Sequence, residues 1–249
     1  MKTILDNGYV ELIETWGSDE RIIEAARMST GKGFIGWGPR FEQVPSRLPS
    51  GGMTTKEVPG DEKLLAYLYN NKHSTPFEMA GMIIEVKAPI FVFREWHRHR
   101  TQSYNEMSAR YIPLPDENYL PSVERMVEGS KATGNKQAQG SKELNEADAT
   151  VWLNQLDTLY KYAQSVYERG IQFGVPKELA RLPVPVARYS RMRASANLRN
   201  WIAFLTLRDH HAAQWEIRQY AKAVGELVAK HFPRTYSLYL TEKYDVQKA

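Results

Sequence analysis

The chain has 249 residues and a formal net charge of +4, a length that suits one large domain or two small ones. It contains no cysteine, which excludes disulfides, thiolate metal sites, iron–sulfur clusters and a cysteine nucleophile. The small basic excess is weak evidence for a nucleic-acid partner, and it fits an enzyme that binds several phosphates equally well.

The start of the chain carries acidic residues early and no long apolar run, so we expect no secretory signal peptide. No stretch approaches 18 consecutive apolar residues, so we expect no membrane span and no membrane partner. A cytoplasmic protein is the default expectation.

The first elements in chain order are two short helices on either side of a loop. Residues 18–29 predict a helix because Ser18 can cap it and Ile22 lies on an apolar face. Residues 61–71 predict a second helix, which Asp61 can cap.

The residues between these helices, 31–60, are rich in glycine and proline and lack periodicity. They predict a long loop, and such loops in compact domains are usually functional lids or disordered segments. Phe34, Trp37 and Phe41 favour a lid, since these aromatic side chains can pack on another surface.

A short helix and a strand follow. In residues 74–81, Thr75 suits the N-cap, and Glu78 completes a capping box. Apolar residues then alternate from Met82 to Ala88, which predicts a strand that ends at Pro89.

Residues 89–100 fit either a strand or a helix. We favour a helix, because Ile90, Phe93 and His97 then fall on one side.

The second half of the chain is mainly helical. Residues 129–142 predict a polar surface excursion, and a long helix over 145–172 follows. A short helix that stops near Pro183, a strand, a helix that Asn197 caps and a last long helix that ends before Pro233 complete the pattern. We therefore expect an α+β fold in a single domain over residues 1–249.

The segment HRHRTQSYNEMSARY, residues 97–111, mixes basic, acidic and hydroxyl side chains. Its ordinary interpretation is a solvated basic face. If the segment is extended, however, Glu106, Ser108 and Arg110 share one face, because alternate residues of a strand point the same way. Such a polar strip suits the recognition of a phosphate or carboxylate.

This segment closely resembles the signature of the flavin-dependent thymidylate synthases. The matching residues are Arg98, His99, Arg100, Asn105, Glu106, Ser108 and Arg110. Residues 73–78, 179–208 and 213–221 resemble further segments of that family, and the likeness runs from about residue 18 to residue 232.

The resemblance implies an enzyme that converts dUMP to dTMP. It implies 5,10-methylenetetrahydrofolate as carbon donor, FAD as hydride carrier, NADPH as reductant and a homotetramer with shared active sites. It also implies a mostly antiparallel sheet flanked by long helices. These ligands are anionic, which explains a cluster of arginines, and no metal site is expected.

The resemblance also assigns residues. For dUMP it implies Glu95, Arg98, Glu106, Ser108, Ala109, Arg110, Arg181 and Arg208. For FAD it implies His73, Thr75, Glu78, Arg98, His99, Arg100, Asn105, Glu106, Asn197, Arg199 and His211. No G-x-G-x-x-G follows a strand, so the expected flavin site is not a Rossmann site.

Arg208 is the residue for which the resemblance implies a catalytic role. A fixed guanidinium beside the uracil carbonyl stabilises negative charge on the ring. Its ordinary interpretation is a cation that offsets the dipole at a helix C-terminus. The chain also departs from the family at three places: Glu95 replaces a glutamine, Ala203 replaces an asparagine, and His210 and His211 displace the usual histidine.

Two alternatives remain open. A basic nucleic-acid-binding protein would use Arg98, Arg100, Arg188, Arg191 and Arg193 on phosphates. A flavoprotein of the same fold without folate chemistry is the other.

Overall fold

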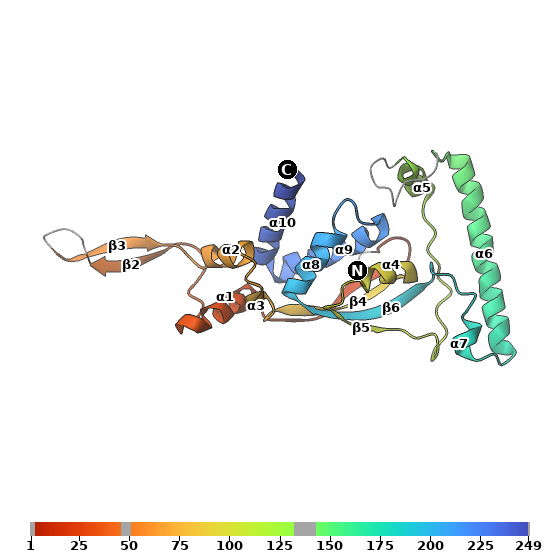
Figure 1. Ribbon diagram of the computed structural model, residues 1–249, viewed down its shortest axis with the longest axis horizontal. Coiled ribbons are helices and arrows are strands. Elements are labelled where there is room, and N and C mark those ends of the chain that lie inside the picture. The colour runs from red at the N-terminus through yellow and green to blue at the C-terminus, as the bar shows by residue number, and fades with distance from the viewer. Residues whose placement is uncertain (1–2, 46–50, 132–142, 249) are drawn as a thin grey trace. The chain divides into compact units, whose positions relative to one another are not determined.

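A computed structural model describes residues 3–45, 51–131 and 143–248 (Figure 1). In chain order the elements are β1 (Tyr9–Trp16), α1 (Asp19–Arg27), η1 (Met28–Thr30), β2 (Arg40–Pro45), β3 (Met53–Val58), α2 (Glu62–Asn70), α3 (Ser74–Phe77), β4 (Gly81–Pro89), α4 (Ile90–Trp96), β5 (Ser103–Glu106), α5 (Val123–Ser130), α6 (Glu146–Gln172), α7 (Lys177–Ala180), β6 (Tyr189–Asn197), α8 (Leu198–Arg208), α9 (Trp215–His231) and α10 (Pro233–Lys248).

Helices and an antiparallel sheet confirm the predicted α+β class. The main sheet has the strand order β1-β4-β6-β5. β5 runs antiparallel to β6, with Asn105 opposite Arg193. The predicted alternation in β4 is also confirmed, because Met82, Ile84 and Val86 are fully buried.

The chain folds into two compact units. The first comprises residues 1–13, 83–195 and 204–224, and the second comprises residues 14–82, 196–203 and 225–249. The expectation of a single domain stays a prediction. Among the described residues, no helix is long and apolar enough to cross a membrane.

The core of the first unit lies where α4 packs against α8. Trp96 is fully buried, and its ring centroid lies 4.5 Å from that of Phe204. The predicted helix is confirmed over Ile90–Trp96. Its buried residues are Val92, Phe93 and Trp96, whereas Ile90 and His97, which the prediction placed on one side with Phe93, are only partly buried. The indole of Trp96 has the larger apolar surface to remove from water, so it sets the helix orientation.

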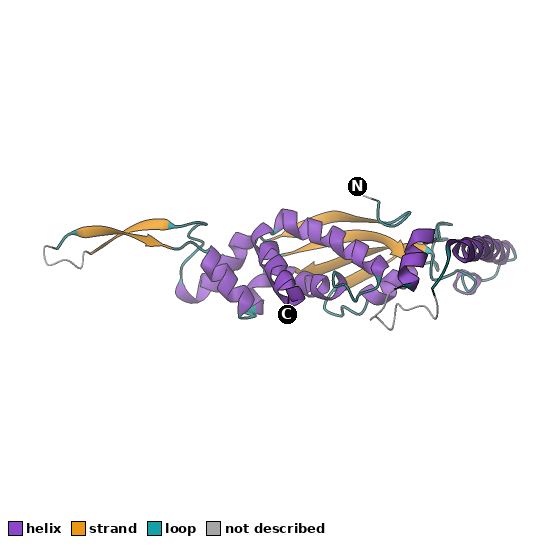
Figure 2. Ribbon diagram, turned by 90° about the horizontal axis from the view of Figure 1, so that it is seen from above, coloured by secondary structure: helices purple, strands orange, loops and turns teal. Residues whose placement is uncertain are grey.

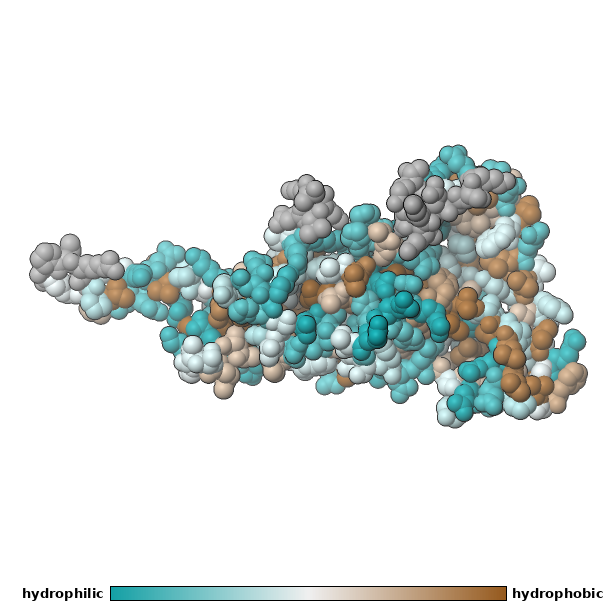
Figure 3. All heavy atoms as spheres, viewed as in Figure 1, coloured by the Kyte–Doolittle hydropathy of each residue, from teal (hydrophilic) through white to brown (hydrophobic). Residues whose placement is uncertain are grey.

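Helix α6 confirms the predicted long helix and has two different faces. Tyr160, Ala163 and Tyr167 are buried in the first unit. Other apolar side chains of this helix are exposed, and they gather over α6 and α7 in Figure 3. They are Val151, Trp152, Leu159, Tyr162 and Val166 on α6, with Phe173, Leu179 and Leu182 nearby.

The second unit is built around α1 and α10. Ser18 caps α1 as predicted, and its hydroxyl accepts from the main-chain N–H of Arg21. The carboxylate of Asp19 accepts from the main-chain N–H groups of Arg234 and Thr235, and so it caps α10. Helix α10 itself was not predicted, because proline was interpreted as the end of a helix although it also suits the first helical position.

The prediction of a loop over residues 31–60 is wrong for two stretches of it. Strands β2 and β3 pair antiparallel, with Phe41 opposite Glu57, and form a separate two-stranded ribbon (Figure 2). The threonines and valines of this ribbon favour strand, but the flanking glycines and prolines masked that signal. Part of the predicted loop, 46–50, lies outside the described residues, and the lid role stays a prediction.

Two predicted helix caps are also wrong. Asp61 precedes α2, but its carboxylate accepts instead from the main-chain N–H groups of Ile35 and Gly36 and pairs with Arg27. Helix α3 begins at Ser74, two residues earlier than a cap at Thr75 predicts, so Thr75 lies inside it. Asp61 and Thr75 match the capping pattern in the sequence, but that pattern does not determine which groups their side chains contact in the fold.

The predicted polar excursion over 129–142 is mostly untested. Its first residues complete helix α5, which the sequence did not predict, and residues 132–142 lie outside the described residues.

Candidate functional site

The signature segment is extended over only part of its length. Strand β5 ends at Glu106, and the main-chain N–H groups of Tyr111 and Ile112 both donate to the carbonyl of Ser108. The condition under which Glu106, Ser108 and Arg110 would share one face of a strand is therefore met only as far as Glu106. A turn presents Ser108 and Arg110 instead, and the Ser108 hydroxyl accepts from the main-chain N–H of Arg110.

Arg208 is the best-defined polar centre of the first unit. At the last residue of α8 its guanidinium donates from Nη1 to Oε2 of Glu95 at 2.7 Å and from Nη2 to the main-chain carbonyl of Glu95 at 2.9 Å. Its Nε donates to Nε2 of His99 at 3.0 Å. The structure thus brings together three residues that the resemblance assigned to the site.

This arrangement does not match the ordinary interpretation of Arg208. A cation that only offsets the dipole of its own helix would lie against the last carbonyls of that helix. Arg208 reaches Glu95 of α4 and His99 just beyond that helix instead, and these contacts use three of the five N–H groups of its guanidinium. The other two have no partner among the described residues and are available to a ligand.

His99 is neutral in this arrangement. An arginine N–H can only donate, so Nε2 of His99 must accept and carries no proton, which leaves the proton on Nδ1. Burial and the nearby charge of Arg208 both disfavour the imidazolium and lower the pKa of His99 to about 4. The histidine therefore acts as a hydrogen-bond acceptor at neutral pH.

Three residues that the sequence did not single out hold this segment in place. The hydroxyl of Tyr104 donates to the carbonyl of His99 at 2.7 Å. The indole of Trp96 donates to Oε1 of Gln102 at 3.1 Å, inside the core. The position of Tyr104 two residues before Glu106 was a signal for a role at the site, but only the fold shows its partners.

Two further arginines assigned to dUMP lie at and beside helix α7. Nε of Arg110 lies 3.6 Å from Oε2 of Glu178, and both side chains are more than half exposed. Nζ of Lys177 donates to the carbonyl of Tyr111, which fixes α7 against the turn. Arg181, the C-cap of α7, is exposed, while Ala109 in the turn is buried.

The residues assigned to flavin fall in both units. In the second unit Nη1 of Arg199 pairs with Oε1 of Glu78 at 2.8 Å, so α3 and the start of α8 are joined there. The side chain of Asn197 caps α8 as predicted, accepting from the main-chain N–H of Asn200. His73 and Thr75 are exposed at α3.

The residues of the first unit that the resemblance assigns to flavin include exposed arginines. Arg98, Arg100, Asn105 and His211 are all exposed. Nε2 of Gln102, by contrast, is buried and has no hydrogen-bond partner among the described residues. Exposed guanidinium groups and this donor fit the anionic, acceptor-rich cofactor that the resemblance implies. Within the described ranges no cluster of three or more histidine, aspartate or glutamate side chains is placed to hold a metal ion.

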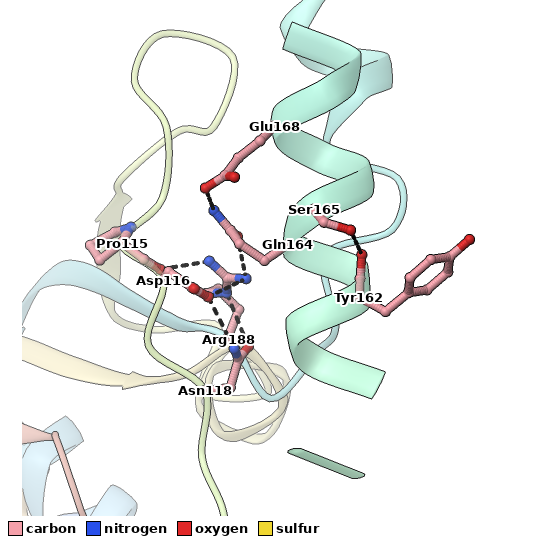
Figure 4. A network of polar contacts seen from close by, with 8 residues as sticks. All are labelled: Pro115, Asp116, Asn118, Tyr162, Gln164, Ser165, Glu168 and Arg188. Carbon is pink, nitrogen blue, oxygen red and sulfur yellow. Dashed lines mark hydrogen bonds and ion pairs between the residues drawn. The ribbon is translucent and has the colours of Figure 1, made fainter. Parts of the chain in front are cut away.

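Arg188 has a different role from the one that a nucleic-acid interface would require. Its side chain is fully enclosed and donates to Asn118, to the carbonyl of Pro115 and to Gln164 (Figure 4). It also lies 3.1 Å from Asp116. An arginine with this surrounding cannot reach an external phosphate, which weakens the nucleic-acid alternative.

Comparison with known proteins agrees with the resemblance. The family model described as thymidylate synthase complementing protein matches residues 11–234. A flavin-dependent thymidylate synthase of Thermus thermophilus is 37% identical over 236 residues, covering 95% of this chain and 77% of the relative. The chain belongs to the flavin-dependent thymidylate synthases.

Other flavin-dependent thymidylate synthases and solved structures extend the match. The relative from Pseudothermotoga lettingae is 33% identical over 242 residues, covering 97% of this chain and 94% of its own length. The UMP/dUMP methylase PolB from Streptomyces cacaoi, solved with 5-Br dUMP, superimposes with a TM-score of 0.77 at 29% identity. That match covers 96% of this chain and 97% of the other. The predicted family and fold class are confirmed.

Proposed function

We propose that this enzyme is a flavin-dependent thymidylate synthase that methylates dUMP to dTMP. The observation that carries the proposal is the Arg208 centre, in which a signature histidine and Glu95 hold a guanidinium that keeps two N–H groups available. A catalyst of this kind needs donors that are fixed before the reaction begins.

The chain's own residues supply binding and charge stabilisation. Arg110 and Arg181, with the turn at Ser108 and Ala109, bind the phosphate of dUMP, because guanidinium groups match phosphate oxygens bidentately. Arg98 and Glu106 complete the proposed set of residues that bind dUMP. Arg208 lies beside a uracil carbonyl and stabilises negative charge on the ring as N3 loses its proton, which makes C5 the stronger nucleophile.

FAD is the proposed cofactor. When bound, it supplies the hydride that completes the methyl group. The residues proposed to hold it are those that the resemblance assigns to flavin: His73, Thr75, Glu78, Arg98, His99, Arg100, Asn105, Glu106, Asn197, Arg199 and His211. NADPH as reductant and 5,10-methylenetetrahydrofolate as carbon donor belong to the same proposal.

A homotetramer with shared sites is the proposed assembly. Support comes from α6, where the exposed apolar face would be an unusually costly surface for a protein alone in water. Two inactive variants test the shared site. Mixing Arg110→Ala with His73→Ala should restore part of the activity if the two residues reach one site from different chains. Mixed tetramers, proved by mass, without recovered activity would contradict the shared site.

The test of the proposed function is a defined reaction. Purified protein is supplied with FAD, NADPH, dUMP and 5,10-methylenetetrahydrofolate, and dTMP is measured by mass spectrometry. We expect dTMP only when flavin and folate are both present, and a flavin absorption spectrum in the purified protein. Flavin binding without dTMP would favour a flavoprotein without folate chemistry, and binding of nucleic acid without flavin would favour the other alternative.

A further inference from the structure

The side chain of Glu95 is committed to Arg208. Its Oε2 accepts from Nη1 at 2.7 Å, and its main-chain carbonyl accepts from Nη2, so two N–H groups on one edge of the guanidinium meet a single residue. The Arg208 side chain is 16% exposed, whereas that of Glu95 is 43% exposed. The guanidinium is therefore held on its protein side, at the border of the solvent.

His99 holds the guanidinium from a second direction. Its Nε2 accepts from Nε of Arg208, and its own ring is packed edge-on against Phe204 with centroids 4.9 Å apart. Tyr104 fixes the main chain of His99 through its carbonyl. Bonds at Nε, Nη1 and Nη2 leave a planar group no freedom to rotate about its long axis.

We infer that Glu95 and His99 are positioning residues for Arg208, which together fix the plane of its guanidinium and so the directions of its two remaining N–H groups at the substrate site. This inference rests on the proposed function for the substrate, but the contacts themselves do not depend on it. It also gives a reason for the departure at Glu95. A carboxylate adds an ion pair to its hydrogen bond with arginine, which the neutral amide that the family resemblance led us to expect cannot do.

The charged groups around His99 agree with this role. Arg208 faces its ring from α8, and Glu95 lies on the other side of the same guanidinium. Protonation of Nε2 would set an N–H against an N–H and a positive charge against a positive charge. The neutral acceptor form is therefore a requirement of the arrangement.

A double-mutant cycle tests the inference. The enzymes compared are the wild type, Glu95→Ala, Arg208→Ala and the double variant, with kcat and KM for dUMP measured for each. We expect Glu95→Ala to lower kcat roughly 10²-fold, the cost of misplacing a catalytic group by about an ångström. In the Arg208→Ala background the same change should cost less than about threefold, because residues that act as one unit are not additive.

The conservative variant and a control sharpen the cycle. Glu95→Gln keeps an acceptor oxygen and should retain more of kcat than Glu95→Ala. Glu24→Ala breaks the exposed pair with Arg21 on α1 and should leave kcat unchanged. If Glu95→Ala costs the same factor with and without Arg208, mainly in KM, Glu95 contacts the substrate itself and the positioning role is overturned.

A second readout needs no substrate. With histidine labelled by ¹⁵N in the ring, the His99 signal, assigned by its loss in His99→Gln, should show an unprotonated Nε2 from pH 5 to 8, a range that lies above its lowered pKa. In Arg208→Ala the two tautomers should mix and the pKa of His99 should rise. A mixed tautomer in the wild type would overturn the inference even if dTMP is formed. A fixed tautomer in an enzyme that forms no dTMP would leave the contacts standing and remove the proposed function.

Discussion

Arg188 and Arg208 belong to the same unit but differ in how completely hydrogen-bond acceptors surround their guanidinium groups. Arg188 has no exposed surface, and acceptors on the 115–118 segment and on α6 surround its guanidinium (Figure 4). Arg208 has three such bonds and keeps two N–H groups without a partner among the described residues. A guanidinium enclosed by hydrogen-bond acceptors of the protein stabilises the fold, whereas one that keeps N–H groups without protein partners can bind a ligand.

The two arginines also differ in what their surroundings do to charge. Burial lowers the pKa of Arg188, while the carboxylate of Asp116 raises it, so the group stays a cation inside the protein. Burial and the nearby charge of Arg208 together keep His99 neutral. The acceptors around Arg188 compensate its buried charge, whereas the acceptors around Arg208 fix the orientation of its guanidinium.

The largest expected effect on stability comes from removing the side chain of Arg188. Arg188→Ala should lower the free energy of unfolding by about 3–5 kcal/mol, because it leaves a buried set of acceptors without a donor. Chemical denaturation measures this change in the free energy of unfolding. Arg193→Ala is the control, since that side chain is 53% exposed with one carboxylate partner, Glu85, and should cost no more than about 1 kcal/mol. Equal losses in the two variants would contradict the structural role of Arg188.

A smaller effect is expected from the pH dependence of His99. Its pKa is about 4 in the folded protein and about 6.5 in the unfolded chain, so the unfolded state takes up a proton first as the pH falls. The stability linked to this residue is therefore complete above pH 6.5 and is lost as the pH falls toward 4, by about 3 kcal/mol in total.

The comparison of variants isolates this contribution. His99→Gln keeps an acceptor but cannot titrate, so its unfolding free energy should fall less between pH 7 and 4.5 than that of the wild type. His97→Gln, which lies outside the Arg208 contacts, should follow the wild type. Parallel curves for wild type and His99→Gln would show that His99 is not held neutral.

The smallest expected effect concerns Arg110, another arginine with few partners. Its only ion pair among the described contacts, at 3.6 Å to Glu178, is exposed and weak. Glu178→Gln removes a carboxylate that competes with the phosphate of dUMP, and the Kd for dUMP should fall by up to about fivefold at low salt. Calorimetric titration measures this change, and a weaker affinity would mean that Glu178 orients Arg110 instead.

Much of the fold followed from periodicity. The alternation from Met82 to Ala88 predicted β4, and the spacing of Tyr160, Ala163 and Tyr167 predicted α6, because each pattern matches one buried face. The sequence did not predict β1, since none of its residues is fully buried and its pattern does not alternate. It missed β2 and β3 for a different reason: they pair with each other, so no buried face marks them.

The family resemblance named Glu95, His99 and Arg208, but it did not show how these residues contact one another. Glu95 lies on α4, which ends at Trp96, and His99 lies three residues beyond the end of that helix. Nothing in the sequence indicated that Arg208, more than a hundred residues later, would donate to both. The same limit explains Arg188, which looked like one cation of an exposed basic series and is enclosed only because α6 packs over it.

The most direct test of the account is the behaviour of Arg208→Lys at saturating dUMP. Lysine keeps the charge but lacks the planar set of donors, so it cannot satisfy Glu95 and His99 and still address the uracil ring. We predict a folded enzyme with nearly unchanged affinity for dUMP and a kcat lower by roughly 10²–10³-fold, or about 2.7–4 kcal/mol of transition-state stabilisation. A folded Arg208→Lys enzyme with the wild-type kcat would remove Arg208 from the mechanism and contradict the account.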